Sequence, residues 1–379
     1  MAAERNVFAV GRGQYENIGD IILRRPLLDW AREGGRLHVY VGNSPDGYDE
    51  ALGVGDDDVI YRSLPKWYSA LLKSALKGTA SSIYKPGEIQ LTLVGMKEHL
   101  VMLPAAALIR ARGGSVSRIG VGARNFAPLP RAVMWPSNAL SSYTRWRDDS
   151  TAEYLGFGSA MPDLGYAEGL SDADLAAAID DTSRDVMVIS LRDDVDVAPR
   201  PYPDEEWFAG ITSFARSQGL EIWVVTQVAV DNDRSRRLVK DLGANLLEWS
   251  EIADHAAQEA RLRALYRRTR VAASDRLHVI IAAFTEGAAP VGLQLYGEDK
   301  EQKVVRHFGT IGIDDVAVNT SGMPAAELAD SLARITSKRG DMLRRLLIAR
   351  GRLSDVRGEL IAVLSDEPAD TLTAEVVVG

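Results

Sequence analysis

The stretch FAVGRGQYENIGDIILRRPLLDW, from Phe8 to Trp30, passes from an apolar run through a loop into an amphipathic segment. This order is typical of a β-strand, a turn and an α-helix, the first unit of a parallel α/β fold. The loop begins like the dinucleotide fingerprint G-x-G-x-x-G, but Glu16 takes the place of its third glycine. The next strand ends in VYVGN and lacks the acidic residue that binds a ribose, so we do not expect NAD binding.

Short β-rich runs alternate with amphipathic segments along nearly the whole chain, which indicates an α/β fold with parallel sheets. The strands expected in the first half are Asn6–Val10, Arg36–Gly42, Asp58–Ser63, Glu88–Gly95 and Val116–Ala123. Those expected in the second half are Val186–Leu191, Glu221–Val228, Asn245–Trp249, Val271–Ala273, Pro290–Leu295 and Asp315–Asn319. Helices are expected between them, for example at Asp20–Glu33, Met96–Arg112, Asp204–Ser217 and Asp231–Leu242.

The length of 379 residues exceeds the usual size of a single core and favours two domains. A polar break after the segment GLSDADLAAAIDD places the boundary near residue 182. We therefore expect Rossmann-like domains at 1–182 and 183–322, facing each other across a cleft, and a helical extension at 323–379. Ligands of such sheets bind at the carboxyl ends of the strands.

Composition narrows the classes of function. The formal net charge of −9 argues against a general nucleic-acid binder. The chain has no cysteine, and its five histidines lack the spacing of a zinc site, so we expect no metal centre. No secretion signal and no membrane span are evident, so a cytoplasmic location is the expectation.

The strongest candidate site lies in SDRLHVIIAAFTEGAAPVGL, from Ser274 to Leu293. A strand ends here, a buried apolar helix begins near Asp275, and Arg276 and His278 fall in its first turn. Free N–H groups at a helix N-terminus attract anions, and arginine adds a bidentate donor. Packing is the alternative role for a single histidine.

Other candidates lie at the ends of predicted strands. Arg192 follows the strand Val186–Leu191, where a second anion contact and a salt bridge with Asp193 or Asp194 are equally expected. Asn17 and Asp20 belong to the turn NIGD at the start of the first helix. They either bind an acceptor hydroxyl or have a local role, in which Gly19 permits the turn and Asp20 caps the helix.

Four motifs in this order resemble the polysaccharide pyruvyl transferase family. They are NIGD near the start, RDDSTAEYL and MPDLGY in the middle, and SDRLHVIIAAFTEGAAPV late in the chain. The segment GGSVSRIGVGARNF also resembles a part of that family, and the similarity extends over about residues 13 to 303. The resemblance implies a GT-B-like fold and an enzyme of glycan biosynthesis, acting on an exopolysaccharide or cell-wall glycan.

The family transfers pyruvate from phosphoenolpyruvate to two hydroxyls of one sugar, forming a cyclic ketal and releasing phosphate. By this resemblance Arg276, Leu277 and Arg192 bind phosphoenolpyruvate, while His278 is the general acid/base. Asp20 is a candidate base for the acceptor, and Asn17 and Gly19 are acceptor contacts. No cofactor is required by this scheme, and any divalent-metal dependence, the oligomeric state and the sugar itself stay open.

Two other functions remain as alternatives. One is a GT-B glycosyltransferase with a nucleotide-sugar donor, for which Glu286 is the only nearby acid that follows the Arg276–His278 turn. The other is a non-catalytic glycan-binding relative. The basic and apolar segment Ser331–Leu364 predicts a C-terminal helix, with its apolar face on the core or, alternatively, at the inner membrane face beside a lipid-linked acceptor.

Overall fold

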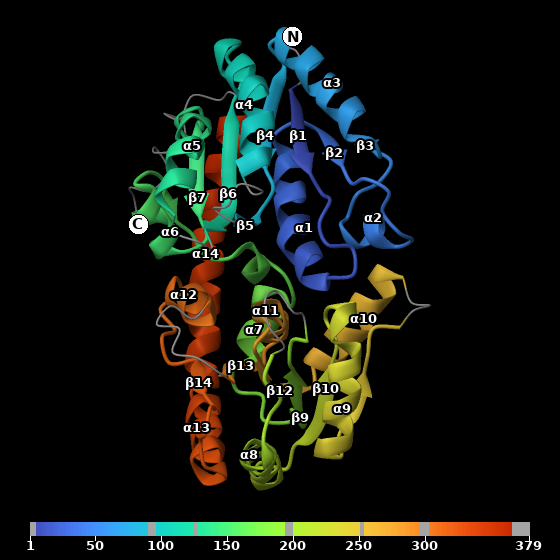
Figure 1. Ribbon diagram of the computed structural model, residues 1–379, viewed down its shortest axis with the longest axis vertical. Coiled ribbons are helices and arrows are strands. Elements are labelled where there is room, and N and C mark those ends of the chain that lie inside the picture. The colour runs from blue at the N-terminus through green and yellow to red at the C-terminus, as the bar shows by residue number, and fades with distance from the viewer. Residues whose placement is uncertain are drawn as a thin grey trace. The chain divides into compact units, whose positions relative to one another are not determined.

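The computed structural model describes residues 5–89, 96–123, 127–193, 200–250, 254–295 and 303–365. The chain divides into two compact units, labelled by element in Figure 1. The first unit comprises Met1–Tyr15, Leu23–Leu164 and Arg352–Gly379, and the second comprises Glu16–Ile22 and Gly165–Gly351. Both units are α/β, as the sequence predicts.

The first unit contains one parallel sheet with the strand order β3-β2-β1-β4-β6-β7-β8, in which β5 also pairs with β6. Its strands are β1 (Asn6–Val10), β2 (Arg36–Tyr40), β3 (Val59–Tyr61), β4 (Ala80–Tyr84), β5 (Gly87–Ile89), β6 (Val116–Ala123), β7 (Tyr143–Trp146) and β8 (Ser159–Ala160). Its helices are α1 (Ile18–Glu33), which belongs to this unit from Leu23 on, α2 (Tyr48–Ala51), α3 (Leu64–Leu76), α4 (Met96–Ala111), α5 (Pro128–Ala139) and α6 (Asp149–Leu155).

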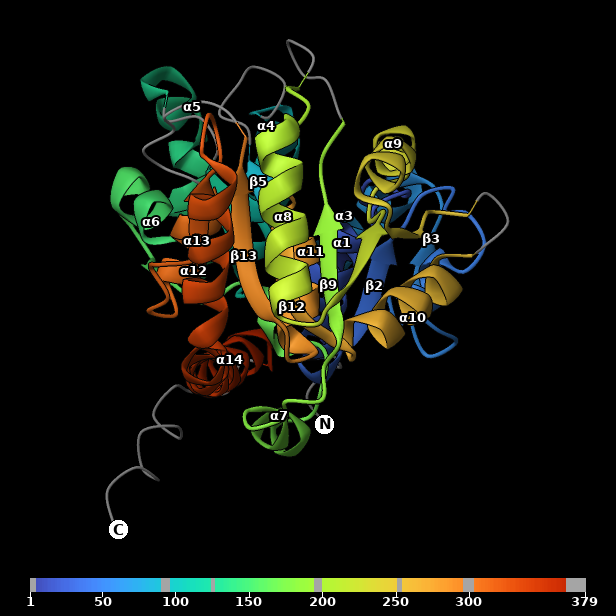
Figure 2. The ribbon, with the colours of Figure 1, turned by 90° about the horizontal axis from the view of Figure 1, so that it is seen from below.

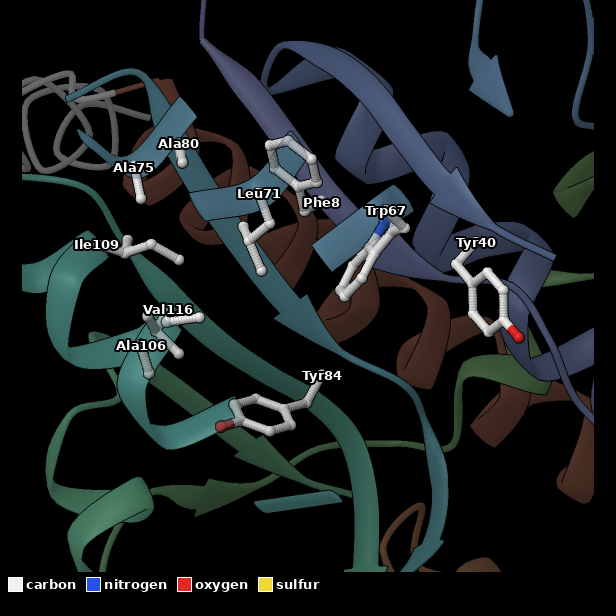
Figure 3. Packing of buried hydrophobic residues seen from close by; sticks show 11 residues of the cluster. Phe8, Tyr40, Trp67, Leu71, Ala75, Ala80, Tyr84, Ala106, Ile109 and Val116 are labelled. Carbon is white, nitrogen blue, oxygen red and sulfur yellow. The ribbon is translucent and has the colours of Figure 1, made fainter. Parts of the chain in front are cut away.

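The core of the first unit lies between this sheet and the helices α3 and α4. Trp67 and Leu71 of α3 and Ile109 of α4 pack over Phe8 of β1 and Val116 of β6, and all of these side chains are buried (Figure 3). Burial of large apolar side chains of this kind contributes about 1.5–3 kcal/mol each to folding. The two helices are thereby fixed on one face of the sheet, and their opposite faces point outward.

The second unit contains a parallel sheet of six strands in the order β11-β10-β9-β12-β13-β14. Its strands are β9 (Val186–Ser190), β10 (Glu221–Val225), β11 (Asn245–Leu247), β12 (Thr269–Ser274), β13 (Ala289–Gln294) and β14 (Ala317–Asn319). Its helices are α7 (Asp172–Ala178), α8 (Glu205–Ser217), α9 (Asn232–Leu242), α10 (His255–Tyr266), α11 (Leu277–Thr285), α12 (Lys303–Gly309) and α13 (Ala325–Ser337), with 3-10 turns at Leu164–Ala167 and Ala229–Asp231. The helices α8 and α13 pack against each other on the sheet (Figure 2).

The strand order of the second sheet reverses direction at β9. Counted along this unit the order is third, second, first, fourth, fifth, sixth, which is that of the Rossmann fold. The chain leaves β9 toward β10 and returns to its other side as β12, so the connecting loops diverge there. Such a switch point, at the carboxyl ends of β9 and β12, is where ligands of these sheets bind.

The last helix, α14 (Arg339–Ser365), runs from the second unit into the residues assigned to the first. Arg339 is buried and donates hydrogen bonds to the carbonyls of Ala178 (2.6 Å) and Gly287 (2.7 Å). Arg350 donates to the carbonyls of Tyr166 (2.8 Å) and Leu170 (2.7 Å). These two cations are therefore held by backbone oxygens of the second unit and are not part of a solvated basic face.

The unit boundary lies between Leu164 and Gly165, earlier than the predicted boundary at residue 182. The segment that contains α7 belongs to the second unit because the carbonyls of Ala178 and Leu170 accept hydrogen bonds from Arg339 and Arg350. The polar break after α7 that suggests a boundary is thus a loop leading to β9. The extension predicted at 323–379 contains α13 and α14.

Candidate functional site

The turn after β12 is tied to the end of β9 by a buried serine. The Ser274 hydroxyl donates to the carbonyl of Ser190 (2.6 Å) and accepts from the backbone N–H of Arg276 (2.9 Å). The helix α11 begins at Leu277, so Arg276 precedes the helix and His278 lies in its first turn. This arrangement fixes Arg276 and His278 at the switch point of the second sheet.

Arg276 makes a bidentate ion pair with Asp231. Its Nε donates to Oδ2 and its Nη2 to Oδ1, each at 2.7 Å. The Asp231 side chain is 0% exposed and that of Arg276 only 12% exposed, so the pair is shielded from water. Asp231 also accepts from the backbone N–H of Asp193 (2.8 Å) and thereby links the loops after β9, β10 and β12. The pair holds Arg276 in one orientation and uses two of its five N–H donors.

Asp275 is a carboxyl group enclosed by the same turn. Its Oδ1 accepts from the backbone N–H of Arg192 (2.9 Å), which brings the end of β9 to the turn. Burial raises the pKa of Asp275 to about 6, and the hydrogen bond from Arg192 and the charges of Arg192 and Arg276 oppose this rise. Its Oδ2 is buried and has no hydrogen-bond partner among the residues that the structure describes.

The NIGD turn belongs to the second unit and is attached to the loop after β10. Asn17 forms an antiparallel bridge with Val228, and the backbone N–H of Ile18 donates to the carbonyl of Gln227 (3.3 Å). The Asn17 side chain accepts from the backbone N–H of Gly19 (2.9 Å) at the start of α1. The capping bond at this turn thus comes from Asn17 and not from Asp20. Asp20 lies in the first turn of α1, where its charge complements the helix dipole, the other local role that the sequence suggests.

Gly19 lies directly against the histidine of the late motif. A Cβ at this position would be 2.8 Å from both Cβ and Nδ1 of His278 and 2.8 Å from Nε2 of Gln227. The φ angle of Gly19 is not in the left-handed region, so the residue is not needed for the turn itself, as the local interpretation assumed. It is needed because two parts of the chain meet there too closely for a side chain. Asn17, Gly19 and His278 are therefore brought together.

Leu277, Arg192 and Glu286 are the remaining residues that the sequence singled out near this turn. Leu277 is 4% exposed, so only its backbone is able to contact a ligand. Arg192 lies two residues beyond the end of β9 and is half-buried. Asp193, one of its suggested partners, pairs with Arg234 (2.9 Å), and Asp194 is outside the described residues.

Glu286, at the far end of α11, is fully buried between Arg263 (3.0 Å) and Arg267 (3.1 Å). It does not supply the ribose contact that a nucleotide-sugar donor suggested.

Sequence patterns did not identify Asp231 or Gln227 as site residues. Both follow β10, and Gln227 is 2% exposed with its Nε2 buried and lacking a hydrogen-bond partner among the described residues. The available signal was their position at or just beyond the carboxyl end of the predicted strand Glu221–Val228, since polar residues there lie at the ligand-binding edge of the sheet. Gln227 Nε2 is a donor, so a ligand with an acceptor oxygen at this edge would satisfy it.

Within the described parts of the chain, no group of three or more histidine, cysteine, aspartate or glutamate residues is placed to bind a metal ion. The same residues include no helix that is both long and apolar enough to cross a membrane.

No family model matches the sequence, and no curated protein matches it. Similar folds occur among solved structures. The UDP-N-acetylglucosamine 2-epimerase of Neisseria meningitidis, solved with UDP-N-acetylglucosamine, superposes with a TM-score of 0.58 at 10% identity, covering 96% of this chain and 100% of the other. The Anabaena protein Alr3699/HepE, solved with UDP and glucose, gives 0.50 at 12% identity, covering 97% and 99%.

These similarities extend over nearly the whole chain and show its fold. The chain has the GT-B fold, built from two Rossmann-like units with a C-terminal helical extension. The site described above lies within the second of these units, at the switch point of its sheet.

Proposed function

We propose that this protein is a glycan-processing enzyme and, more specifically, a ketal pyruvyltransferase that uses phosphoenolpyruvate. The observation that carries the proposal is the contact of Gly19 with His278. This contact brings together the first and last of the four motifs that resemble the polysaccharide pyruvyl transferase family. They meet at the edge of the sheet where ligands of such folds bind. The motifs are about 250 residues apart in the chain, so their meeting is not a consequence of local structure.

The charges at this edge suit the donor. Phosphoenolpyruvate carries a carboxylate and a phosphate, and arginine recognises both in a bidentate manner. Arg192 and Arg276 reach the edge from β9 and β12, and the N-terminus of α11 adds backbone N–H groups. Asp231 already neutralises part of the charge of Arg276. The role of Asp231 is therefore to hold Arg276 in place, and Arg192 supplies the second cation at the edge.

The proposed reaction has balanced atoms and charges. A proton adds to the terminal CH2 of phosphoenolpyruvate, and one sugar hydroxyl adds to C2 and loses its proton. The bond between C2 and the bridging oxygen then breaks, and this oxygen leaves with the phosphate and the electron pair. The second hydroxyl adds to C2 and closes the ketal, and its proton is released to the phosphate. We assign to His278 the giving and taking of these protons, and Asp20 is the candidate base for the acceptor.

The transfer itself is the test. The protein is incubated with phosphoenolpyruvate and a panel of free, nucleotide-linked and lipid-linked sugars, and both phosphate release and the ketal product are measured. We expect acceptor-dependent release that His278→Gln lowers by about 100-fold or more. His38→Gln, a change at a half-buried histidine of the first unit, is the matched control. Release that survives the loss of His278 would overturn its assignment, and no ketal with any acceptor would overturn the function.

A second candidate is an enzyme that uses a nucleotide sugar. It is favoured by the two similar structures, which were solved with UDP-N-acetylglucosamine or with UDP and glucose. The burial of Glu286 between two arginines counts against it, because the expected acid for a ribose is already occupied. Hydrolysis or epimerisation of UDP-N-acetylglucosamine without any reaction of phosphoenolpyruvate would establish this alternative.

A further inference from the structure

Three helices of the first unit, α3, α4 and α5, expose large apolar side chains. Leu129 and Trp135 of α5 are each 66% exposed, and Leu100 and Val101 of α4 and Leu76 of α3 are also exposed. Neighbouring helices of this group contact each other, and the Tyr68 hydroxyl of α3 donates to the Val101 carbonyl of α4 (2.8 Å). Figure 1 shows the three helices in the first unit. We call their outward-facing residues the α3–α5 surface.

The α3–α5 surface is also basic. The three helices contain five basic residues (Lys66, Lys73, Lys97, Arg110 and Arg131) and one acidic residue, Glu98, which gives a net charge of +4. Glu98 is paired with Lys85 (2.7 Å) and so adds little negative potential. The whole chain has a net charge of −9, so this concentration of positive charge is opposite in sign to the rest of the protein.

Two of the lysines line a hollow in this surface. Lys66 and Lys73, two turns apart on α3, border a hollow of about 410 Å³ together with Pro65, Ser69 and Ala70. The hollow is open to solvent, and lysines beside it are attracted to the anionic headgroups of a lipid surface.

We propose that the α3–α5 surface docks on an anionic lipid bilayer. Tryptophan and leucine side chains insert at the boundary between headgroups and acyl chains, and neighbouring basic residues are attracted to anionic headgroups. The surface combines both features on adjacent helices whose other faces are fixed on the sheet. The sequence suggested membrane contact by the basic C-terminal helix instead, but Arg339 and Arg350 of that helix are bound to backbone carbonyls.

Sedimentation with lipid vesicles tests this proposal on the full chain. We expect binding to vesicles of phosphatidylglycerol and phosphatidylcholine but not to phosphatidylcholine alone, with a loss at high salt. Each basic residue near such a surface contributes about a five-fold increase in affinity, so Lys66→Gln/Lys73→Gln/Arg131→Gln is expected to weaken binding by on the order of 100-fold. The matched control, Arg237→Gln/Lys240→Gln/Arg344→Gln, neutralises three exposed cations of the second unit and is expected to bind normally.

A second variant tests the apolar part. Leu129→Ser/Trp135→Ser changes exposed side chains and leaves the core intact, so its thermal unfolding should match that of the wild type. It is expected to lose vesicle binding, and in the wild type brominated lipid should quench Trp135 fluorescence, a signal that Trp135→Phe removes. Equal binding of all variants would overturn the proposal. The proposal would also be overturned if the wild type formed a dimer in light scattering, bound no vesicles, and lost the dimer on the double change.

Discussion

Gly19 is the residue at which the two ends of the candidate site meet. Its missing side chain leaves room for the ring of His278 and the amide of Gln227, and no local rule of turn formation would have pointed to this. The sequence predicted Arg276 and His278 as site residues because a helix N-terminus follows a strand there, and it predicted Asn17 and Gly19 through their turn at a helix start and the family resemblance. It did not predict Asp231, because an ion pair between residues 45 positions apart leaves no periodic pattern in the sequence.

Replacing Gly19 with alanine should displace the His278 ring. The new Cβ would lie 2.8 Å from the His278 Cβ, an atom that cannot move without its backbone. We expect acceptor-dependent phosphate release to fall at least 10-fold, and stability to fall by about 1–3 kcal/mol from overpacking. Gly55→Ala is the control, because a Cβ there meets nothing within 4 Å. Unchanged activity of Gly19→Ala would show that the contact with His278 does not matter.

Asp275 should make the stability of the protein depend on pH. Burial raises the pKa of Asp275 to about 6, so the folded protein keeps this proton where the unfolded chain has lost it. The stabilisation from this proton is complete below the unfolded pKa of about 4 and is lost as the pH rises through about 6. Asp275→Asn, which is neutral at every pH, should therefore be more stable than the wild type at pH 8, by on the order of 2 kcal/mol.

Urea denaturation at several pH values measures this difference. The advantage of Asp275→Asn should disappear near pH 3, where the wild-type carboxyl is protonated in the folded state and largely in the unfolded state. A difference between the two proteins that stays constant from pH 4 to pH 8 would contradict the assignment of the raised pKa to Asp275.

At the scale of elements, the sequence predicted the strands best where they are apolar. The bounds of β1 and β6 were predicted correctly, whereas β4 was not foreseen. The strand β4 has the sequence ASSIY, and its serines are buried because it pairs with β1 and β6 on both sides; Ser81, for example, accepts a hydrogen bond from Ser115 (2.9 Å). Polar residues that are buried by tertiary pairing give no hydrophobic pattern.

Prolines do not prevent a helix in one segment of the first unit. The stretch APLPRAVMWPSN contains three of them, and residues Pro128–Ala139 form the helix α5. Pro128 and Pro130 lie in its first turn, where the missing N–H would have no partner within the helix. Only Pro136 lies deeper in the helix, and the buried Met134 and Ser137 beside it hold that turn on the first unit.

Arg339 of α14 should be important for the stability of the second unit. Arg339→Met would leave the buried carbonyls of Ala178 and Gly287 without their donors, which we expect to cost about 2–4 kcal/mol. Arg344→Met is the matched control on the same helix, since Arg344 bonds the exposed Asp341 and should contribute less than about 1 kcal/mol. Thermal unfolding distinguishes the two variants, and an equal loss in both would contradict the role given to Arg339.

At the scale of the whole molecule, the GT-B fold could be predicted but the division of the chain could not. Alternating strands and helices indicate two parallel sheets, and the structure contains them. The units are interleaved in sequence, however, because Glu16–Ile22 belongs to the second unit and Arg352–Gly379 to the first. Hydrophobic periodicity in the sequence reflects contacts between residues a few positions apart. It therefore does not reveal which unit a short segment packs against.

This interleaving is what gives the candidate site its composition. The Asn17–Asp20 turn comes from the start of the chain, and yet it lies in the same unit as Arg276 and His278. The central claim is that these residues form one binding site for phosphoenolpyruvate.

Isothermal calorimetry with phosphoenolpyruvate, beside UDP-N-acetylglucosamine, tests that claim most directly. We predict one phosphoenolpyruvate site per chain, weakened at least 10-fold by Arg276→Lys, which keeps the charge but loses the bidentate geometry. Arg270→Gln, at the amino end of the same strand β12, should bind as the wild type does. Binding of UDP-N-acetylglucosamine with no heat from phosphoenolpyruvate, or phosphoenolpyruvate binding that Arg276→Lys leaves unchanged, would contradict it.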